Sequence, residues 1–442
     1  MMKKAFNILF AISVVITPVF RAGAQEGGGD ISLELAAQAI ASNQGIFELN
    51  REIASLMRRS DAARMWDRPV VSVEYMDFPW NTFGFDDMGM TGVQVMLMQM
   101  FPFPGKNDRR QAAASADVET KRWELEGLKL NLSGLVRTTY YRLALNRQLE
   151  KVTDKHIELI EQLISAVRAK YESGRANQQD ILRLTVLRER LRDDLNDYRQ
   201  QDIELSAMIN STLHRDVATA IETPLQIKPP PPDFDFEPVF AEALDKSPML
   251  KMFSAHASAM RLAAERERYE IMPDISLSAG YKIRAKSMND DGVDYLSVGI
   301  SLPLPFDYTN RFDNMRLEML EKASSAEFAR KKTADAIAFE LKKGLSMWKR
   351  AFQKARTYET EIYPSAERTL AAALLAYQTD RADFASLYQA EVELIDFERE
   401  IYTAKVDAAI MKIHIETMLG SGLENLSVGA KEIKENADED NK

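Results

Sequence analysis

The chain has 442 residues, 45% of them hydrophobic, with a formal net charge of −10 and no cysteine. That length and apolar content suffice for two or three ordinary domains with a core. The absence of cysteine excludes disulfides, thiol catalysis and a lipidated N-terminal cysteine, and the acidic balance argues against a nucleic-acid-binding protein, which would carry a basic face.

The first predicted element is a secretory signal peptide over residues 1–24. Lys3 and Lys4 precede an apolar run over residues 5–20, and Ala22-Gly23-Ala24 follows it. A basic start, a short apolar run and an Ala-x-Ala sequence are typical of a signal that is cleaved on export. An uncleaved membrane anchor is the alternative, for which the run is short. We therefore expect an exported chain.

A helix over about 32–66 is followed by two alternating segments, 69–78 and 91–101. A period of two predicts β-strands, and a length of about ten residues is typical of a transmembrane strand. A soluble amphipathic sheet is the alternative, because alternation alone does not distinguish lipid from a protein core. The second segment is less polarised than the first: Val93, Val95, Leu97 and Phe101 alternate with Gln94, Met96, Met98 and Met100.

Two long helices are predicted next, over about 106–173 and 178–217. No proline interrupts this part of the chain, and a helix of about 68 residues would reach roughly 100 Å. The turn between them is Gly174–Asn177, where Gly174 can adopt the positive φ of a helix end and Asn177 can cap the next helix. The two helices form a predicted hairpin.

A proline-rich linker over 223–238, which includes Pro229–Pro232, separates this first half from a second one. The second half repeats the order, with strands over about 273–284 and 293–302 and helices over about 306–379 and 384–419. The last helix carries a heptad seam, which predicts coiled-coil packing, at Leu387, Ala390, Leu394, Phe397, Ile401, Ala404, Ala408, Met411, Ile415 and Met418. An acidic tail over 423–442 ends the chain.

The two halves also repeat short motifs in the same order. Pro69–Tyr75 has a counterpart in Pro273–Ala279, Phe101–Pro104 in Leu302–Pro305, and Tyr171–Asn177 in Tyr377–Asp383. Subtraction gives offsets of 204, 201 and 206 residues, far longer than the unit of a solenoid. We interpret residues 25–222 and 239–422 as two copies of one structural repeat.

The number of strands has a consequence for assembly. Beyond the signal there is no apolar run of about 18 residues, so a membrane span would have to be made of strands. Open sheet edges cannot face hydrocarbon, and the smallest spanning barrels have about eight strands. Two chains would supply eight strands and three would supply twelve, enough for an open lumen. If the membrane interpretation holds, the sequence predicts an oligomer.

These features resemble the TolC-like outer membrane factors, over nearly the whole chain after the signal. The resemblance rests on the duplicated plan and on the turn at Tyr171–Arg175 followed by Asp180-Ile-Leu; Gln99–Lys106 is similar to the heavy-metal branch. It implies a mixed, mainly α fold: a trimeric 12-stranded outer-membrane β-barrel on a periplasmic α-barrel. It also implies an exit duct of a tripartite efflux pump, with a periplasmic adaptor and an inner-membrane transporter of the RND type as partners.

The resemblance further implies a gate and an adaptor-docking surface at the periplasmic tips. The gate candidates are acidic residues: Asp380, Asp383, Asp180 and Glu391. The docking candidates are the turn residues Gly174, Arg175, Ala176, Asn177, Arg381 and Ala382. Asp383 could instead be only a helix cap, and Glu391 one solvated charge among many. The second turn departs from the first because Asp380 replaces Gly174, which leaves its geometry open.

Other functions remain as alternatives. The duct could serve type I protein secretion, or the chain could be a secreted coiled-coil scaffold that forms no channel. Met96, Met98 and Met100 could bind Cu(I) or Ag(I) through their thioethers, or simply fill apolar gaps. No catalytic triad, phosphate loop or metal-ligand cluster occurs at meaningful spacing, and the histidines lie far apart: His156, His214, His256 and His414. We expect no enzyme, no cofactor, no resident metal and no nucleic acid.

Overall fold

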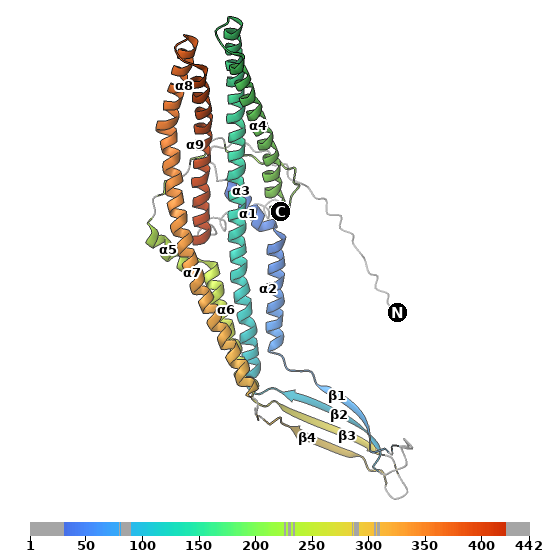
Figure 1. Cartoon of the computed structure of the whole chain (residues 1–442). Coiled ribbons are helices and arrows are strands. Elements are labelled where there is room, and N and C mark those ends of the chain that lie inside the picture. Colours follow the sequence, from blue (N-terminus) through green and yellow to red (C-terminus); the bar gives the residue numbers. More distant parts are fainter. Residues whose placement is uncertain are drawn as a thin grey trace, which may run out of the picture.

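The computed structural model describes residues 31–78, 80, 90–224, 227–228, 231–232, 235–284, 286, 291–304, 306 and 310–420. The expected signal peptide and acidic tail lie outside these residues, as do most of the loops 79–90 and 286–292 and part of the proline-rich linker. The described chain consists of a bundle of long helices with a small sheet at one end (Figure 1).

The sheet has four antiparallel strands in the order β1-β2-β3-β4. They are β1 (Val70–Met76), β2 (Gly92–Phe101), β3 (Ile275–Arg284) and β4 (Tyr295–Ser301). Each half of the chain contributes one pair, and β2 joins β3 over ten residue pairs from Gly92↔Arg284 to Phe101↔Ile275. Because each outer strand has one neighbour among the described residues, β1 and β4 form the two edges of the sheet.

The register separates the side chains of the sheet into an apolar face and a polar face. Directly paired residues share a face, so Val71 pairs with Leu97 and Val73 pairs with Val95 on one side. The apolar face is open to solvent in the single chain, with exposures from 42% to 77% for Val71, Val73, Val95, Leu97, Ile275, Leu277, Tyr281, Ile283, Leu296, Val298 and Ile300. Serines, glycines, Gln94, Lys282 and the β2 methionines occupy the other face.

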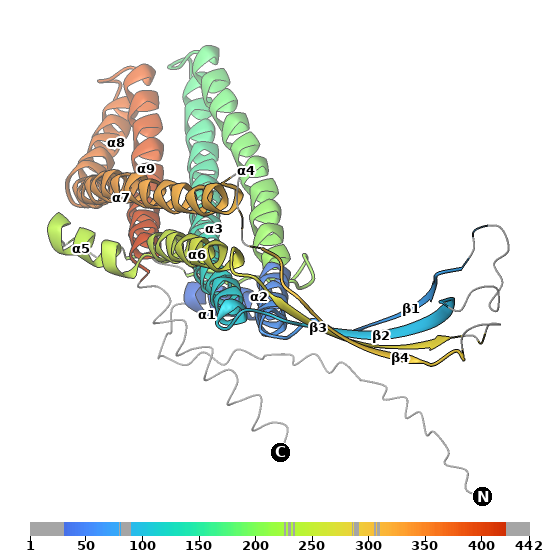
Figure 2. The same ribbon diagram turned by 90° about the horizontal axis from the view of Figure 1, so that it is seen from below.

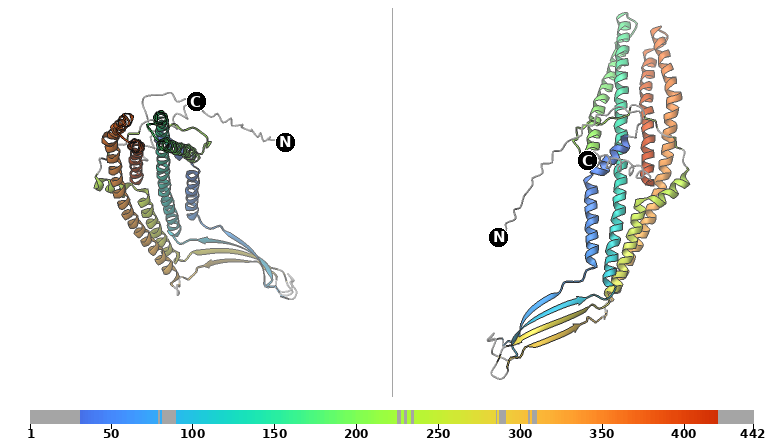
Figure 3. Two further views of the ribbon diagram at one scale, coloured as in Figure 1. Left: turned by 45° about the horizontal axis from the view of Figure 1, so that its top comes forward. Right: turned by 180° about the vertical axis from the view of Figure 1, so that it is seen from behind.

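The helical body is built from two similar sets of helices. The first set is α1 (Ile31–Ser42), α2 (Gln44–Ala63), α3 (Lys106–Glu172) and α4 (Gln178–Thr212). The second set is α5 (Phe236–Lys246), α6 (Pro248–Glu270), α7 (Arg311–Thr357), α8 (Tyr363–Gln378) and α9 (Phe384–Leu419). The hairpins α3/α4 and α8/α9 stand side by side and point away from the sheet, which leaves the body at an angle (Figures 1, 2 and 3). No helix within the described ranges combines the length and apolar character needed to cross a membrane.

The helix expected over 32–66 is divided into α1 and α2, and its counterpart in the second half was not expected from the sequence. Asn43 separates α1 from α2 in an extended conformation, and its Oδ1 accepts a hydrogen bond of 2.9 Å from the amide of Gly45. Ser247 separates α5 from α6, and Pro248 is tolerated because it occupies the first helical position. The two breaks are 204 residues apart by subtraction, so each half contains the same broken helix.

The long helix expected over 306–379 also differs in detail. It begins at Arg311, and a π-helical turn at Tyr358–Ile362 interrupts it before α8. Pro364 lies just after this turn, where its missing N–H cannot join a regular helical hydrogen bond. The helix expected over 178–217 ends earlier, at Thr212.

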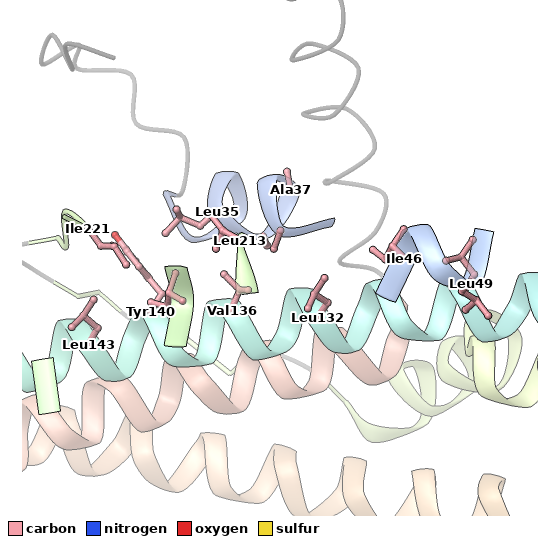
Figure 4. Packing of buried hydrophobic residues seen from close by; sticks show 14 of the residues in the cluster. Leu35, Ala37, Ile46, Leu49, Leu132, Val136, Tyr140, Leu143, Leu213 and Ile221 are labelled. Carbon is pink, nitrogen blue, oxygen red and sulfur yellow. The ribbon is translucent and has the colours of Figure 1, made fainter. Parts of the chain in front are cut away.

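One hydrophobic cluster lies along α3, with which α1 and α2 pack. Apolar side chains of the two short helices meet α3 from one side (Figure 4). Leu132, Val136, Tyr140 and Leu143 of α3 are each at most 8% exposed, and Leu213 after α4 closes the same cluster. This arrangement fixes α3 as the central helix, and the upper part of α3 then carries the hairpin tip.

Candidate gate at the tips of the helical hairpins

The two hairpin turns have the same backbone geometry despite their different residues. Gly174 has φ 74° and Asp380 has φ 59°, both in the left-handed region. In both turns the amide of the following residue donates a hydrogen bond back to a carbonyl of the preceding helix. Arg175 N donates to Lys170 O at 2.9 Å, and Arg381 N donates to Ala376 O at 2.8 Å. Aspartate is among the few non-glycine residues that tolerate this region. Asp380, at the place that Gly174 occupies in the first turn, therefore gives the second turn the same geometry.

Two of the gate candidates, Asp383 and Asp180, accept hydrogen bonds at the start of the helix that follows their turn. Asp383 Oδ1 accepts hydrogen bonds from the amide of Ser386 at 3.1 Å and from its hydroxyl at 2.6 Å. These bonds hold the pKa of Asp383 below its usual range. Asp180 accepts from the amide of Asn177 at 3.3 Å. Both carboxylates are thus helix caps, with charge that remains near the tip.

Asp380 instead joins the two hairpins through a contact that we call the tip contact (Lys170, Tyr377 and Asp380). Lys170 Nζ of α3 lies 2.5 Å from Asp380 Oδ1, donates to the carbonyl of Tyr377, and stands 4.4 Å from the centroid of the Tyr377 ring. Arg175 Nη1 is 4.0 Å from the other carboxylate oxygen. The bond to Lys170 holds the pKa of Asp380 below its usual range, so the carboxylate stays charged.

Directly below the tips, an apolar cluster packs the hairpins against each other. It contains Ile160 and Val167 of α3, Leu184 of α4 and Leu387 of α9, each no more than 1% exposed. Tyr377 and Phe384 cover its upper end, with ring centroids 6.1 Å apart. Any movement that separates the two hairpins at the tips must open this cluster.

The fourth gate candidate, Glu391, lies inside the wall between the hairpins, with 1% exposure. It is part of a group that we call the buried histidine cluster: Lys155 and His156 of α3, Tyr363 of α8, and Glu391 and Glu398 of α9. His156 is fully buried; its Nδ1 lies 3.1 Å from Glu391 and its Nε2 lies 2.9 Å from Glu398. Glu391 therefore faces His156 rather than open space in the single chain.

Sequence analysis did not identify His156, because its partners are more than 230 residues away along the chain. A signal was nevertheless present. Glu391 and Glu398 are one heptad apart and each directly follows a residue of the apolar seam of the last helix, so both acids point to the same side of α9. Buried acids in such a seam require partners with positive charge or N–H donors.

Further polar contacts continue the seam between α3 and α9 toward the sheet. Arg137 Nη1 lies 2.7 Å from Glu416, and the Arg137 side chain is 7% exposed. Arg399 of α9 reaches both Asp194 of α4, at 2.8 Å, and Thr153 of α3, at 3.0 Å. With the tip contact and the buried histidine cluster, these bonds hold α9 to the first hairpin at several heights.

No family model matches the chain, and no curated protein matches it. Solved structures do match. The outer membrane protein VceC from Vibrio cholerae superposes with a TM-score of 0.73 at 15% identity, over 88% of this chain and 96% of that one. The Campylobacter jejuni CmeC outer membrane channel gives 0.72 at 12% identity, over 90% and 89%. The open state of the Neisseria gonorrhoeae MtrE outer membrane channel gives 0.70 at 13%, over 89% of both chains. The chain has a TolC-like fold.

The TolC-like fold confirms the mainly helical architecture with a small antiparallel sheet that the sequence predicts. Identities of 12–15% establish the fold and not the branch, so the heavy-metal interpretation of Gln99–Lys106 stays a prediction.

The docking candidates occupy the end of the TolC-like fold that lies farthest from the sheet (Figure 1). Gly174, Arg175, Asn177 and Arg381 are exposed there, whereas the two alanines, Ala176 and Ala382, are half-buried. The two turns thus present a compact surface that combines arginines with the acidic caps. Their assignment to an adaptor stays a prediction.

The three methionines of β2 lie on the polar face of the sheet. Across the strands, Met96 pairs with Ser72 and Gly280, and Met98 pairs with Ser278. Met98 also pairs with Val70 and is 38% exposed, whereas Met96 and Met100 are half-buried. This placement is compatible with both metal binding and packing, so it leaves the two sequence interpretations open.

Proposed function

We propose that this chain forms the outer membrane exit duct of a tripartite efflux pump and passively conducts small substrates or metal cations to the exterior. One observation carries the proposal. A sheet with an exposed apolar face and a polar face is attached directly to a helical body with the TolC-like fold. An apolar face of this kind suits lipid, and a polar face suits a water-filled lumen.

The proposed assembly is a homotrimer. Among the described residues, strands β1 and β4 each have a neighbouring strand on one side only, and an open edge is costly in hydrocarbon. Three copies close twelve strands into a barrel in the outer membrane, and their helices form a tube in the periplasm. In this proposal the signal over 1–24 is cleaved from each subunit. The mature subunit then consists of the repeats 25–222 and 239–422, the linker 223–238 between them, and the tail 423–442.

We place the gate at the tips. In a trimer each tip carboxylate becomes a ring of three, a dense negative field that attracts cations. Asp380 and Asp383 are the principal candidates and Asp180 is secondary; Glu391 is assigned to the wall because it is buried. The turn residues dock a periplasmic adaptor, which in turn joins an inner-membrane transporter of the RND type.

The duct is tested by locating and reconstituting the full-length protein. We expect it in the outer membrane fraction, as a trimer by native mass spectrometry after detergent extraction, with stable conductance in planar lipid bilayers. A soluble periplasmic rod, or monodisperse monomers without conductance, would refute the duct and favour the scaffold.

The gate is tested separately by block of the current with divalent or trivalent cations. The double variant Asp380→Asn and Asp383→Asn should weaken the block, because two rings of negative charge are lost. Asp193→Asn is the matched control, since this exposed aspartate of α4 lies away from the tip. Unchanged block in the double variant would remove both residues from the gate.

A further inference from the structure

We propose that the buried histidine cluster is a pH-sensitive pin, which holds α9 against α3 while His156 is protonated and releases it when the proton leaves. The pin joins the hairpin α3/α4 to the hairpin α8/α9. Its role in opening a duct rests on the proposed function, whereas the pin itself is a property of the single chain.

The geometry favours a doubly protonated ring. His156 is fully buried, and each of its nitrogens lies within hydrogen-bond distance of a carboxylate, 3.1 Å from Glu391 and 2.9 Å from Glu398. A carboxylate ion only accepts hydrogen bonds, and a neutral imidazole has a single N–H to donate. When both acids are ionised, only the imidazolium can donate to both at once.

The charges around His156 balance only in this state. Lys155 of α3 lies 3.0 and 2.9 Å from the two oxygens of Glu398, and Tyr363 of α8 lies 3.3 Å from the same carboxylate. Burial and Glu398 raise the pKa of Tyr363 and of the neighbouring Tyr402 of α9, so both phenols stay neutral. Toward α4, Arg399 of α9 pairs with Asp194 at 2.8 Å. Within the cluster two cations therefore face two anions, and a further carboxylate, Glu367 of α8, lies beside Tyr363.

Loss of the proton affects the two acids unequally. Glu398 retains Lys155 and Tyr363, but the bond of Glu391 to the ring becomes a contact between a buried anion and a neutral group. A buried charge without a partner of opposite sign is strongly unfavourable. Separation of α9 from α3 relieves this cost, because it lets water reach Glu391.

The direction with pH follows from the two shifted groups. Burial opposes protonation of His156, but its bonds to Glu391 and Glu398 outweigh burial and raise the pKa above 6.5. This contribution is complete below 6.5 and is lost as the pH rises through the raised value. Burial also opposes the charge of Glu398, but its bonds to His156 and Lys155 hold the pKa below 4.5, so that contribution is lost only in stronger acid. The pin holds between these limits and releases toward alkaline pH.

Hydrogen exchange of the full-length protein in detergent tests the pin. Peptides that cover residues 152–160 of α3 and 388–401 of α9 are followed from pH 6 to 9, with correction for the intrinsic exchange rate. We expect protection in the wild type to fall by about tenfold for each unit by which the fold raises the histidine pKa. His156→Gln should abolish this transition, whereas the control His414→Gln should keep it, because His414 lies 4.0 Å from Glu340 outside the cluster.

A wild type without the transition, or a His156→Gln variant that keeps it, would overturn the proposal. If His156→Gln does not fold, Glu391→Gln is the second variant; it removes one acid and should move the transition to lower pH. Exchange of the imidazole C2 hydrogen in the wild type gives the histidine pKa directly, and a value below 6.5 for His156 would also overturn the pin. A protein that shows the transition but does not conduct would refute the duct and leave the pin standing.

Discussion

Replacing Leu387 with alanine measures how strongly the apolar cluster below the tips holds the two hairpins together. Leu387 of α9 is 1% exposed and packs in one cluster with Ile160, Ile164 and Val167 of α3. The substitution removes three buried carbon atoms, which corresponds to a loss of about 2.4 kcal/mol from transfer alone. The residual cavity brings the usual cost of such changes to roughly 3–5 kcal/mol.

The assay is hydrogen exchange of the α3 amides around residues 157–167, which lie on the opposite hairpin. A loss of about 3 kcal/mol corresponds to a decrease of roughly 100-fold in protection if these amides exchange by separation of the hairpins. Leu375→Ala is the matched control, because it deletes the same atoms from a side chain of α8 that is 63% exposed. A decrease below about threefold for Leu387→Ala, or equal decreases for both variants, would refute the idea that this cluster holds the seam.

Four further substitutions test other parts of the structure. Glu270→Gln removes a carboxylate that lies 2.6 and 2.8 Å from two nitrogens of Arg110; the midpoint of thermal unfolding should fall at pH 7. Burial opposes the charge of Glu270, but its bonds to Arg110 outweigh burial and hold the pKa below 4.5, so the wild-type advantage should persist above 4.5 and disappear as the pH drops through the lowered value. Gly174→Ala places a side chain at φ 74° with no atom within 4 Å; backbone strain alone should cost about 1 kcal/mol in urea unfolding. Gly134→Ala should destabilise α3, because the new Cβ would lie 2.7 Å from a threonine of α9, whereas Gly127→Ala meets no atom within 4 Å and should stabilise by up to about 1 kcal/mol. Equal effects of Gly134→Ala and Gly127→Ala would contradict the close approach of α3 and α9.

The strands were predictable because their pattern is local. A period of two assigned Val71 and Val73 to one face of their strand and Val95 to one face of the next, and the register brings both sets to the same face of the sheet. The same local reasoning placed both hairpin turns, since Gly174 and the acids that follow are ordinary signals of helix ends. These features depend on near neighbours in the sequence, so one amino-acid sequence is sufficient to predict them.

The contacts between the hairpins were not predictable in the same way. His156 and Glu398 are 242 residues apart, and neither has a neighbour in the sequence that indicates the other. The break at Ser247 was also missed, because a proline at 248 is equally typical of a loop and of a first helical turn. Such features depend on which elements the fold brings together.

The offset between the two copies grows from 201 residues at Pro104 and Pro305 to 206 at Gly174 and Asp380, so the second copy is five residues longer here. By their numbers, α3 begins two residues after Pro104 and α7 begins six after Pro305, which takes up four of the five. The fifth extra residue lies within the helical segment itself, because 68 residues run from Arg311 to Gln378 and 67 make up α3. A π-helical turn accommodates one extra residue without the full rise per residue of an α-helix. The two copies therefore differ in sequence and length, while the long helical segments that lead to the two tips differ by a single residue.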